Sequence, residues 1–302
     1  MNARSLLVAV IAGAATLSAA TGASGSTTTS PHRTASPHGT TSGRAAVSVR
    51  GFRVAAGLHV PGGRLPRVIS PGAQSVSNSP NWAGYVAAGQ PNVALRFVSG
   101  DWTMPSLNAS RCVPGTSTYA YADDWVGLDG WGSTSKTVEE IGTGSYCQSG
   151  GTVSYYAYYD MVPSPPQVFT GDNPGDAITA SVYYDSTHHD YSLVLTDVTN
   201  GNQINVTAAC PSGSTCKNSS AEAITEATGG GPPAVNLADF GMINRTGATV
   251  TSRSGLRGSL GSTNLWSSVD VNMTDPSTGV RMATPSPLYG GQAFNVAWNA
   301  AS

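Results

Sequence analysis

Short runs rich in Val, Thr, Tyr and Trp fill the chain after Pro80, and turn-forming Gly, Asn, Asp and Pro separate them. Such residues favour strands, and this spacing is typical of β-sandwiches and barrels. No stretch of about ten residues shows the apolar period of a helix. Alternating runs around Thr199-Asn200-Gly201 predict a hairpin. The chain therefore predicts one large all-β domain, with strand signals at residues 81–89, 94–105, 119–130, 152–163, 177–185, 191–207, 236–243, 263–271 and 293–299.

The first 23 residues have the pattern of a secretory signal peptide. Arg4 precedes an apolar run, and small residues around Ala20 suit cleavage. We therefore expect a secreted, extracellular protein. No later stretch approaches the roughly 20 apolar residues of a membrane span, so no membrane anchor is predicted.

Charged residues are distributed unevenly along the chain. All 17 acidic residues lie from Asp101 onward, so a domain at 77–302 has a formal charge of −9 and the part before it one of +7. Residues 24–76 are poor in large apolar side chains and predict a basic propeptide or linker that is largely disordered by itself. Because this basic segment should be attracted to the acidic domain, we predict that it binds and inhibits the domain. The ion pairs between the two parts would weaken as the carboxylates protonate. A surface tether is the alternative.

Four cysteines in an exported chain favour disulfides over metal ligands, and their order suggests Cys112 with Cys147 and Cys210 with Cys216. A zinc site usually offers closer Cys or His pairs at both ends, so neither a metal nor a cofactor is predicted. His188 and His189 lie together at a predicted surface turn, and no GxSxG elbow accompanies them, which argues against a serine triad.

The remaining candidates for functional residues are carboxylate and aromatic side chains. An acidic domain without a Gly-rich phosphate loop would repel nucleic acid, so no nucleic-acid partner is predicted. Glu139 and Glu140 are neighbours on a predicted strand and must face opposite ways. One of them therefore points to a buried or concave face, where a charge is costly without a partner.

Five motifs resemble, in order and at similar spacing, the bacterial branch of the glutamic peptidase (eqolisin) family. They are PNWAGY, DWVGLDG, TVEEIGTG, YYAYYDMVP and CKNSSAEAITE, and the later ATPSPLYGGQAFNVAW is also similar. The resemblance spans about Asn81 to Asn299. It implies a two-sheet antiparallel β-sandwich, a jelly roll like that of concanavalin and other lectins, with a concave groove that binds an extended polypeptide.

The resemblance also implies a catalytic pair of one Glu and one Gln. The Glu falls on Glu226, which would activate a water and then protonate the leaving amine; Glu222 lies on the same side of an ideal strand, and only the motif separates the two. The Gln position falls on Glu140, a departure from the family, with Glu139 facing away. A carboxylate donates to an oxyanion only when protonated, so we expect acid-limited activity or an impaired enzyme. Solvation of both glutamates at a strand end is the alternative.

Four further residues match substrate-cleft positions of the family: Trp82, Trp125, Asp129, and Asp160, which replaces a usual Glu. The sequence thus predicts a secreted acid endopeptidase, acting as a monomer on extended polypeptides. Two alternatives stay open at this point. One is a non-catalytic β-sandwich that binds carbohydrate or peptide, and the other is a glycoside hydrolase that uses two carboxyl groups.

Overall fold

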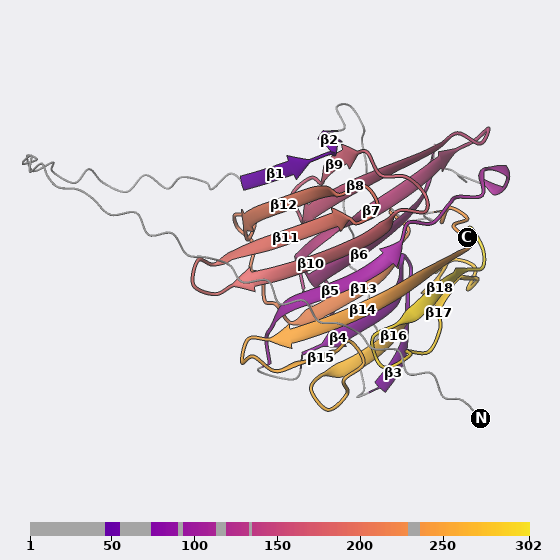
Figure 1. Cartoon of the computed structure of the whole chain (residues 1–302). Coiled ribbons are helices and arrows are strands. Elements are labelled where there is room, and N and C mark those ends of the chain that lie inside the picture. Colours follow the sequence, from indigo (N-terminus) through magenta and orange to yellow (C-terminus); the bar gives the residue numbers. More distant parts are fainter. Residues whose placement is uncertain (1–45, 55–73, 90–92, 113–118, 133–134, 229–235) are drawn as a thin grey trace, which may run out of the picture. The chain divides into compact units, whose positions relative to one another are not determined.

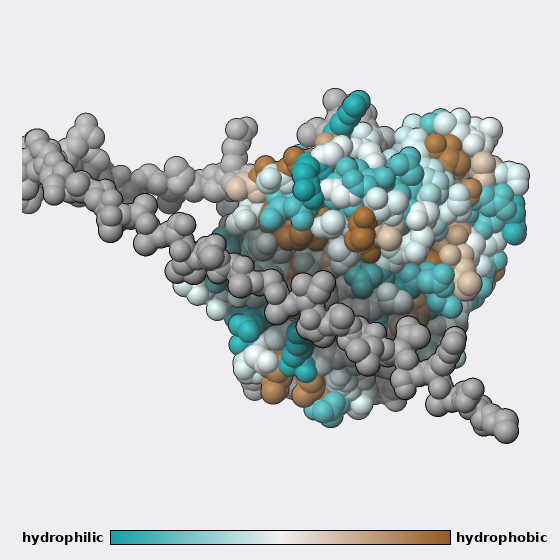
Figure 2. Space-filling view, in the orientation of Figure 1, coloured by the Kyte–Doolittle hydropathy of each residue, from teal (hydrophilic) through white to brown (hydrophobic). Residues whose placement is uncertain are grey.

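The computed structural model describes residues 46–54, 74–89, 93–112, 119–132, 135–228 and 236–302. These residues form 18 strands and one short 3-10 helix, Ala109–Arg111 (Figure 1). The predicted signal peptide and much of the predicted propeptide lie outside the described residues. On the face seen in Figure 2, hydrophilic residues cover most of the surface and apolar residues are scattered among them.

Nine strands pair side by side into the first sheet. All neighbours in it are antiparallel except β3 and β16, which pair in parallel. From one edge to the other, the order is β2 (Arg53–Val54), β9 (Gln167–Thr170), β8 (Val153–Met161), β7 (Val138–Gln148), β6 (Tyr119–Asp129), β13 (Ser220–Glu226), β4 (Trp82–Ala88), β16 (Ser267–Thr274) and β3 (Gln74–Ser79).

The second sheet is antiparallel throughout, with β15 (Arg257–Ser259) beside β14. Its last strand, β17, also pairs with β16 and so joins the two sheets. The order is β1 (Ala46–Arg50), β12 (Asn202–Ala209), β11 (Asp190–Asp197), β10 (Ala177–Asp185), β5 (Leu95–Thr103), β14 (Met242–Ser252), β18 (Phe294–Trp298) and β17 (Arg281–Pro285).

The main apolar core lies between the two sheets and contains side chains of both, such as Val126 and Ile141 from the first and Val182 and Leu193 from the second. The predicted two-sheet β-sandwich is therefore confirmed. Strand β11 alternates buried and half-buried residues, as expected for a strand with one covered face. Strands β6, β7 and β13 are instead buried on both faces, because a second apolar cluster lies on the other side of the first sheet.

The predicted hairpin is confirmed, since Asp197 pairs with Asn202 across the turn. The predicted strand at 236–243 is wrong: before β14 begins at Met242, this stretch makes one isolated bridge, between Leu237 and Tyr121. Its backbone instead hydrogen-bonds to Tyr121 near the start of β6 and to Ala301. Only Met242 and Ile243 of the long strand β14 lie in a predicted strand, because its Thr and Asn residues and Gly247 hide the apolar alternation after them.

Both predicted disulfides are confirmed. Cys112 bonds to Cys147 with an S–S distance of 2.03 Å, and Cys210 bonds to Cys216 at 1.99 Å. The first ties the loop after β5 to the end of β7, and the second closes a short loop before β13. Within the described ranges, no helix has the length and apolar character to cross a membrane.

Candidate active site

Glu140 lies on β7 and points away from the main core, into which its neighbour Ile141 points. The strand register places Gly127 on one side of Glu140 and Asp160 on the other. A side chain at Gly127 would begin 3.2 Å from the Cβ of Glu140 and 2.9 Å from the Trp125 ring. The glycine therefore leaves the space that the Glu140 side chain needs.

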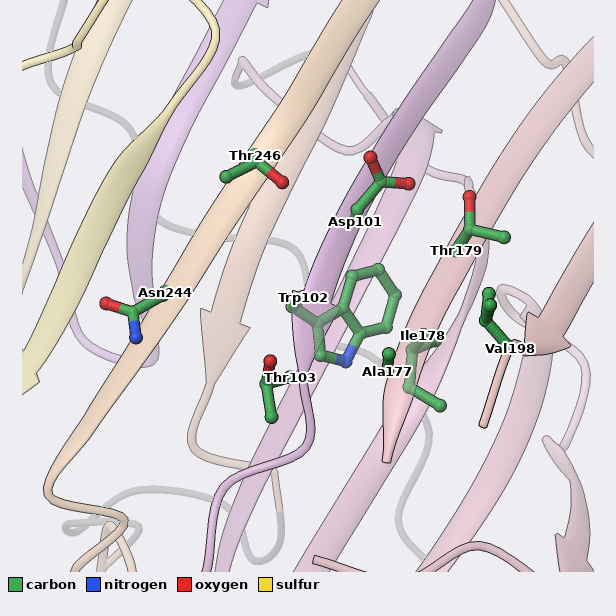
Figure 3. A pocket seen from close by; sticks show the side chains of 9 residues that line it. All are labelled: Asp101, Trp102, Thr103, Ala177, Ile178, Thr179, Val198, Asn244 and Thr246. Carbon is green, nitrogen blue, oxygen red and sulfur yellow. The ribbon is translucent and has the colours of Figure 1, made fainter. Parts of the chain in front are cut away.

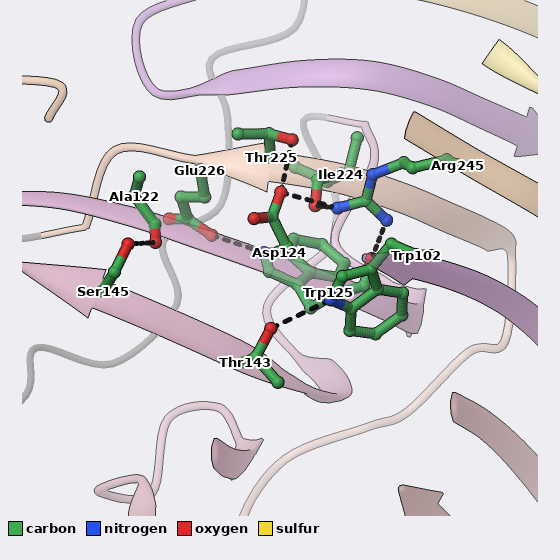
Figure 4. Close-up of polar contacts among 10 residues, drawn as sticks. All are labelled: Trp102, Ala122, Asp124, Trp125, Thr143, Ser145, Ile224, Thr225, Glu226 and Arg245. Atoms are coloured by element: carbon green, nitrogen blue, oxygen red, sulfur yellow. Dashed lines mark hydrogen bonds and ion pairs between the residues drawn. The ribbon is translucent and has the colours of Figure 1, made fainter. Parts of the chain in front are cut away.

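Glu226 is the last residue of β13, and two donors hold its carboxylate. The indole Nε1 of Trp125 donates to Oε2 over 3.0 Å (Figure 4), and Nδ2 of Asn81 donates to Oε1 over 2.9 Å. The Oγ of Ser79 donates to Oδ1 of Asn81 at 3.2 Å and fixes that amide. A carboxylate accepts both of these hydrogen bonds, which fix the orientation of the buried Glu226 side chain.

The two carboxyl groups act on each other. Burial raises the pKa of Glu140 well above its ordinary value, the charge of Glu226 raises it further, and the nearby hydroxyl of Tyr158 opposes the change. Apart from the Tyr158 hydroxyl, no group of the described residues donates a hydrogen bond to the Glu140 carboxyl. Burial and the charge of Glu226 therefore both favour the neutral form of Glu140. The charge of Glu226 acts on Glu140, and the catalytic role of the two residues stays a prediction. The solvated alternative is wrong because Glu139 and Glu140 are fully buried.

Glu139 faces away from this pair, as predicted. Its pKa is raised well above the ordinary value by burial and then by the charge of Asp129. Glu222 belongs to the same surroundings, because burial and the charges of Asp129 and Glu139 raise its pKa well above the ordinary value. Asp129, Glu139 and Glu222 therefore form a second acidic cluster, distinct from the pair of Glu140 and Glu226.

Asp129 holds the start of β13. Its Oδ2 accepts from the Asn218 backbone at 2.7 Å, and its Oδ1 accepts from the backbone N–H of Ser219 at 2.7 Å and from the Ser219 hydroxyl at 3.0 Å. The residue adopts a φ of +65°. Both carboxylate oxygens are occupied by the chain itself, so a substrate contact of Asp129 stays a prediction.

The other three predicted cleft residues adjoin the pair. Trp82 packs edge-on against Trp125, with ring centroids 4.9 Å apart and planes at 78°. Asp160 lies opposite Glu140 in the register, and its charge contributes to the raised pKa of Glu140. The indole N–H of Trp82 has no acceptor within the part of the chain that the structure describes. Trp82 itself is fully buried.

The sequence analysis missed Asp123. It pairs with Glu226 in the register, and its two carboxyl oxygens accept from Tyr156 and Thr228, each at 2.5 Å. Burial raises the pKa of Asp123 to about 7, despite both hydroxyl donors. A usable signal was present, because alternation along YADDWVGLDG places Asp123 on the same face as Trp125.

Arg245 contacts β6 and β13 from the core side of the first sheet. The sequence analysis did not predict this residue either. Its guanidinium is 3.0 Å from Asp124 Oδ1, donates to the Trp125 carbonyl at 3.2 Å and donates to the Ile224 carbonyl (Figure 4). It also lies over the Trp102 ring, 5.2 Å from its centroid. One buried cation therefore connects the two strands, β6 and β13, that carry Trp125 and Glu226.

Other features of the described residues do not resemble a reaction centre. A cavity of about 260 Å³ lies over β5, β10 and β14, where Asp101 is the one carboxylate among its lining residues (Figure 3). His188 is exposed and lies 2.7 Å from Asp185 at a surface turn. No group of three or more His, Cys, Asp or Glu within these ranges is arranged to hold a metal ion.

A β-sandwich with a buried carboxyl pair on one sheet face defines a class of protein suited to acid–base hydrolysis through water. The chain belongs to the Peptidase A4 family, whose sequence model matches residues 80–290. It is thus a glutamic-type peptidase by family, which favours that prediction over the binding module and the glycoside hydrolase. A comparison with curated proteins found no match.

Solved structures share the fold. A crystal structure of scytalido-glutamic peptidase with a peptide-based transition state analog is 24% identical, with a TM-score of 0.56. SCP-B, a member of the eqolisin family in complex with the tripeptide Ala-Ile-His, is 22% identical, with a TM-score of 0.54. Each likeness covers 72% of this chain and 98% of the other. These structures establish a common sandwich.

Proposed function

We propose that the protein is a secreted endopeptidase that hydrolyses peptide bonds at acidic pH through Glu226 and Glu140. One observation carries the proposal: two neighbouring buried carboxyl groups have unlike surroundings. Two N–H donors hold the carboxylate of Glu226, whereas the Tyr158 hydroxyl is the one donor of the described residues that acts on Glu140, whose pKa is raised. Environments that push two carboxyl groups apart assign one as base and the other as acid.

Glu226 is the general base. It takes a proton from a water molecule as the water oxygen attacks the carbonyl carbon of the scissile peptide. The carbonyl oxygen becomes an oxyanion, and the protonated Glu140 donates a hydrogen bond to it. Glu226 then passes its proton to the leaving nitrogen as the C–N bond breaks. The carboxylate of Glu226 is restored, and Glu140 has kept its own proton.

The substrate is an extended polypeptide that lies against Trp82 and Trp125, with Asp160 beside Glu140. Support comes from the unpaired indole N–H of Trp82 and from the position of both rings next to Glu226. The two solved relatives described above hold a peptide-based analog and a tripeptide. Asp129 would act on the substrate indirectly, by fixing the start of the strand that ends at Glu226.

The proposal includes the route to the active form. Residues 1–23 direct export, the basic segment 24–76 inhibits the domain, and residues 77–302 work outside the cell as a monomer. The opposite formal charges of the two parts, +7 and −9, support the inhibitory role. The boundary at residue 77 stays a prediction, and strand β3 begins at Gln74.

The test is fragment release from an unfolded protein substrate between about pH 2 and 7, with pepstatin present to silence aspartic peptidases. We expect acid activity in the processed wild type and its loss in Glu226→Gln, by ~10²-fold or more, because the general base is gone. Glu222→Gln is the matched control on the same strand and should keep the activity. Equal activity in wild type and Glu226→Gln, or cleavage of polysaccharide alone, would refute the proposal.

A further inference from the structure

A short N-terminal segment bridges the two sheets at one edge of the sandwich. Strand β1 pairs with β12 over five residue pairs, from Ala46 with Thr207 to Arg50 with Gln203. Strand β2 follows at once and pairs with β9 through Arg53 and Val54. Because β1 is the edge strand beside β12 in one sheet and β2 is the edge strand beside β9 in the other, residues 46–54 connect both edges (Figure 1). We call this segment the edge clasp.

Phe52 anchors the crossing between the two strands of the clasp. Its side chain is 7% exposed and belongs to the core between the sheets. Gly171, at the end of β9, fits against it, since a Cβ there would lie 3.3 Å from the Phe52 ring. Val49 packs on the same core from β1. Burial of an aromatic ring is among the largest single contributions to such a contact.

Gly51 makes the crossing possible. Its φ is +79°, and a Cβ there would lie 1.8 Å from Oδ1 of Asn202, so no other residue fits without displacing that side chain. Asn202 in turn donates from Nδ2 to the Gly171 carbonyl at 3.2 Å. The turn of the clasp is therefore fitted to the ends of both edge strands.

Charge plays no visible part in this attachment. Arg50 and Arg53 are exposed, and neither forms an ion pair with an acidic side chain of the described ranges. The sequence analysis expected the basic segment to be held by ion pairs that weaken in acid. Backbone pairing and the burial of Phe52 instead involve no ionisable side chain of the clasp itself. The titratable group next to the clasp is Asp172, which follows Gly171 and whose pKa burial raises to about 7.

Next to the clasp, the same edge is hollow. A cavity of about 390 Å³ is lined by residues of β8, β9 and β12, including Tyr159, Gln167 and Ala208. Ala208 directly follows Thr207, the last residue that pairs with β1. The edge is thus filled where the clasp runs and open beyond its end.

We propose that the facing edges of β9 and β12 form a docking surface for one extended strand, and that Ala46–Val54 is its occupant at acidic and neutral pH alike. Pairing of an extended segment with exposed sheet edges is a common mode of peptide recognition, and it also protects edges that would otherwise pair between molecules. A cut anywhere between Val54 and Gln74 would leave the clasp bound as a separate strand. The inference goes beyond the proposed peptidase activity and does not require it.

The test uses the full chain with the recognition sequence of a specific protease inserted between Gly63 and Arg64. All forms carry Glu226→Gln, so that self-cleavage cannot interfere and the outcome is independent of the proposed activity. After cutting, gel filtration at pH 7 and pH 4 measures how much N-terminal fragment stays with the domain. We expect the same retention at both pH values. Phe52→Ala should weaken retention on the order of 100-fold, and the control Arg50→Ser/Arg53→Ser should not change it.

Release by acid alone, or release in the arginine variant with full retention in Phe52→Ala, would overturn the inference. Hydrogen exchange of the uncut chain checks that the fold is intact. Phe52→Ala should lose amide protection in β1 and β12 and keep it in the distant strand β18. If Phe52→Ala does not fold, Gly51→Ala replaces it, since the added Cβ would strain the turn and displace Asn202. Unchanged protection of β1 in that variant would equally overturn the inference.

Discussion

Trp125 on β6 orients the carboxylate of Glu226 on the neighbouring strand β13, because its indole Nε1 donates to Oε2 of Glu226 over 3.0 Å. The backbone of Trp125 is tied on the opposite face, where its carbonyl accepts from Arg245. The orientation of the proposed base thus depends on contacts on both sides of the first sheet. Positioning of this kind contributes to rate without touching the reacting atoms.

Replacing Trp125 by Phe should lower kcat about 10- to 100-fold, because a hydrogen bond to a charged group contributes about 1.5 to 3 kcal/mol. The phenyl ring still packs on Trp82, so KM should change little. Steady-state kinetics on a defined peptide checks this. Trp131→Phe is the matched control, since the Trp131 indole N–H has no partner among the described residues. Equal kcat in both variants would contradict the role of the Trp125 hydrogen bond.

The pH profile should respond to Glu140→Gln. The pKa of Glu140 is raised, so the wild-type residue keeps its donor proton in acid and loses it as pH rises through that pKa. The Gln amide donates at every pH, and activity should therefore extend to higher pH. Rates measured from about pH 2 to 7 test this. Glu139→Gln, on the same strand but facing away, should keep the wild-type profile, and an unshifted profile for Glu140→Gln would refute the assignment.

Stability should decline as pH rises, and Asp172 is a good probe of this. Burial raises its pKa from 3.8 to about 7, and neither carboxyl oxygen has a hydrogen-bond partner within the described ranges. The folded state therefore binds a proton that the unfolded state releases, and this stabilisation is lost between about pH 4 and pH 7. Asp172→Asn should flatten the decline by up to ~4 kcal/mol. Urea unfolding of both proteins at pH 4 and pH 7 measures this free energy. The same pH dependence in wild type and Asp172→Asn would contradict the prediction.

The ion pair of Asp124 and Arg245 should behave as a unit. Both side chains are 2% exposed, so Asp124→Asn leaves a buried guanidinium uncompensated and should cost about 3 to 5 kcal/mol of unfolding free energy. Adding Arg245→Met should recover part of that loss, because no buried charge is then left. A double-mutant cycle by urea unfolding provides the measurement. Strict additivity of the two single changes would contradict the coupling.

Local sequence pattern determined much of this protein. Alternation and turn residues predicted most strands, the hairpin at Gly201 and the opposite facing of Glu139 and Glu140, because the period of a strand is a property of neighbouring residues. The order of the cysteines was enough for both disulfides. The same local pattern failed at residues 236–243, which make one isolated bridge to Tyr121 before β14 begins.

Only the tertiary structure decided which distant residues meet. The pairing of β7, β6 and β13 places Glu140 and Glu226 on one face of the first sheet, where the charge of Glu226 acts on Glu140. The packing of β14 from the second sheet buries Arg245 on the other face. Phe52 lies in a segment whose composition predicts disorder, yet it fills the core where two edge strands face each other. Burial, partners and shifted pKa values arise from contacts between strands far apart in the chain, and these depend on topology, which no local period encodes.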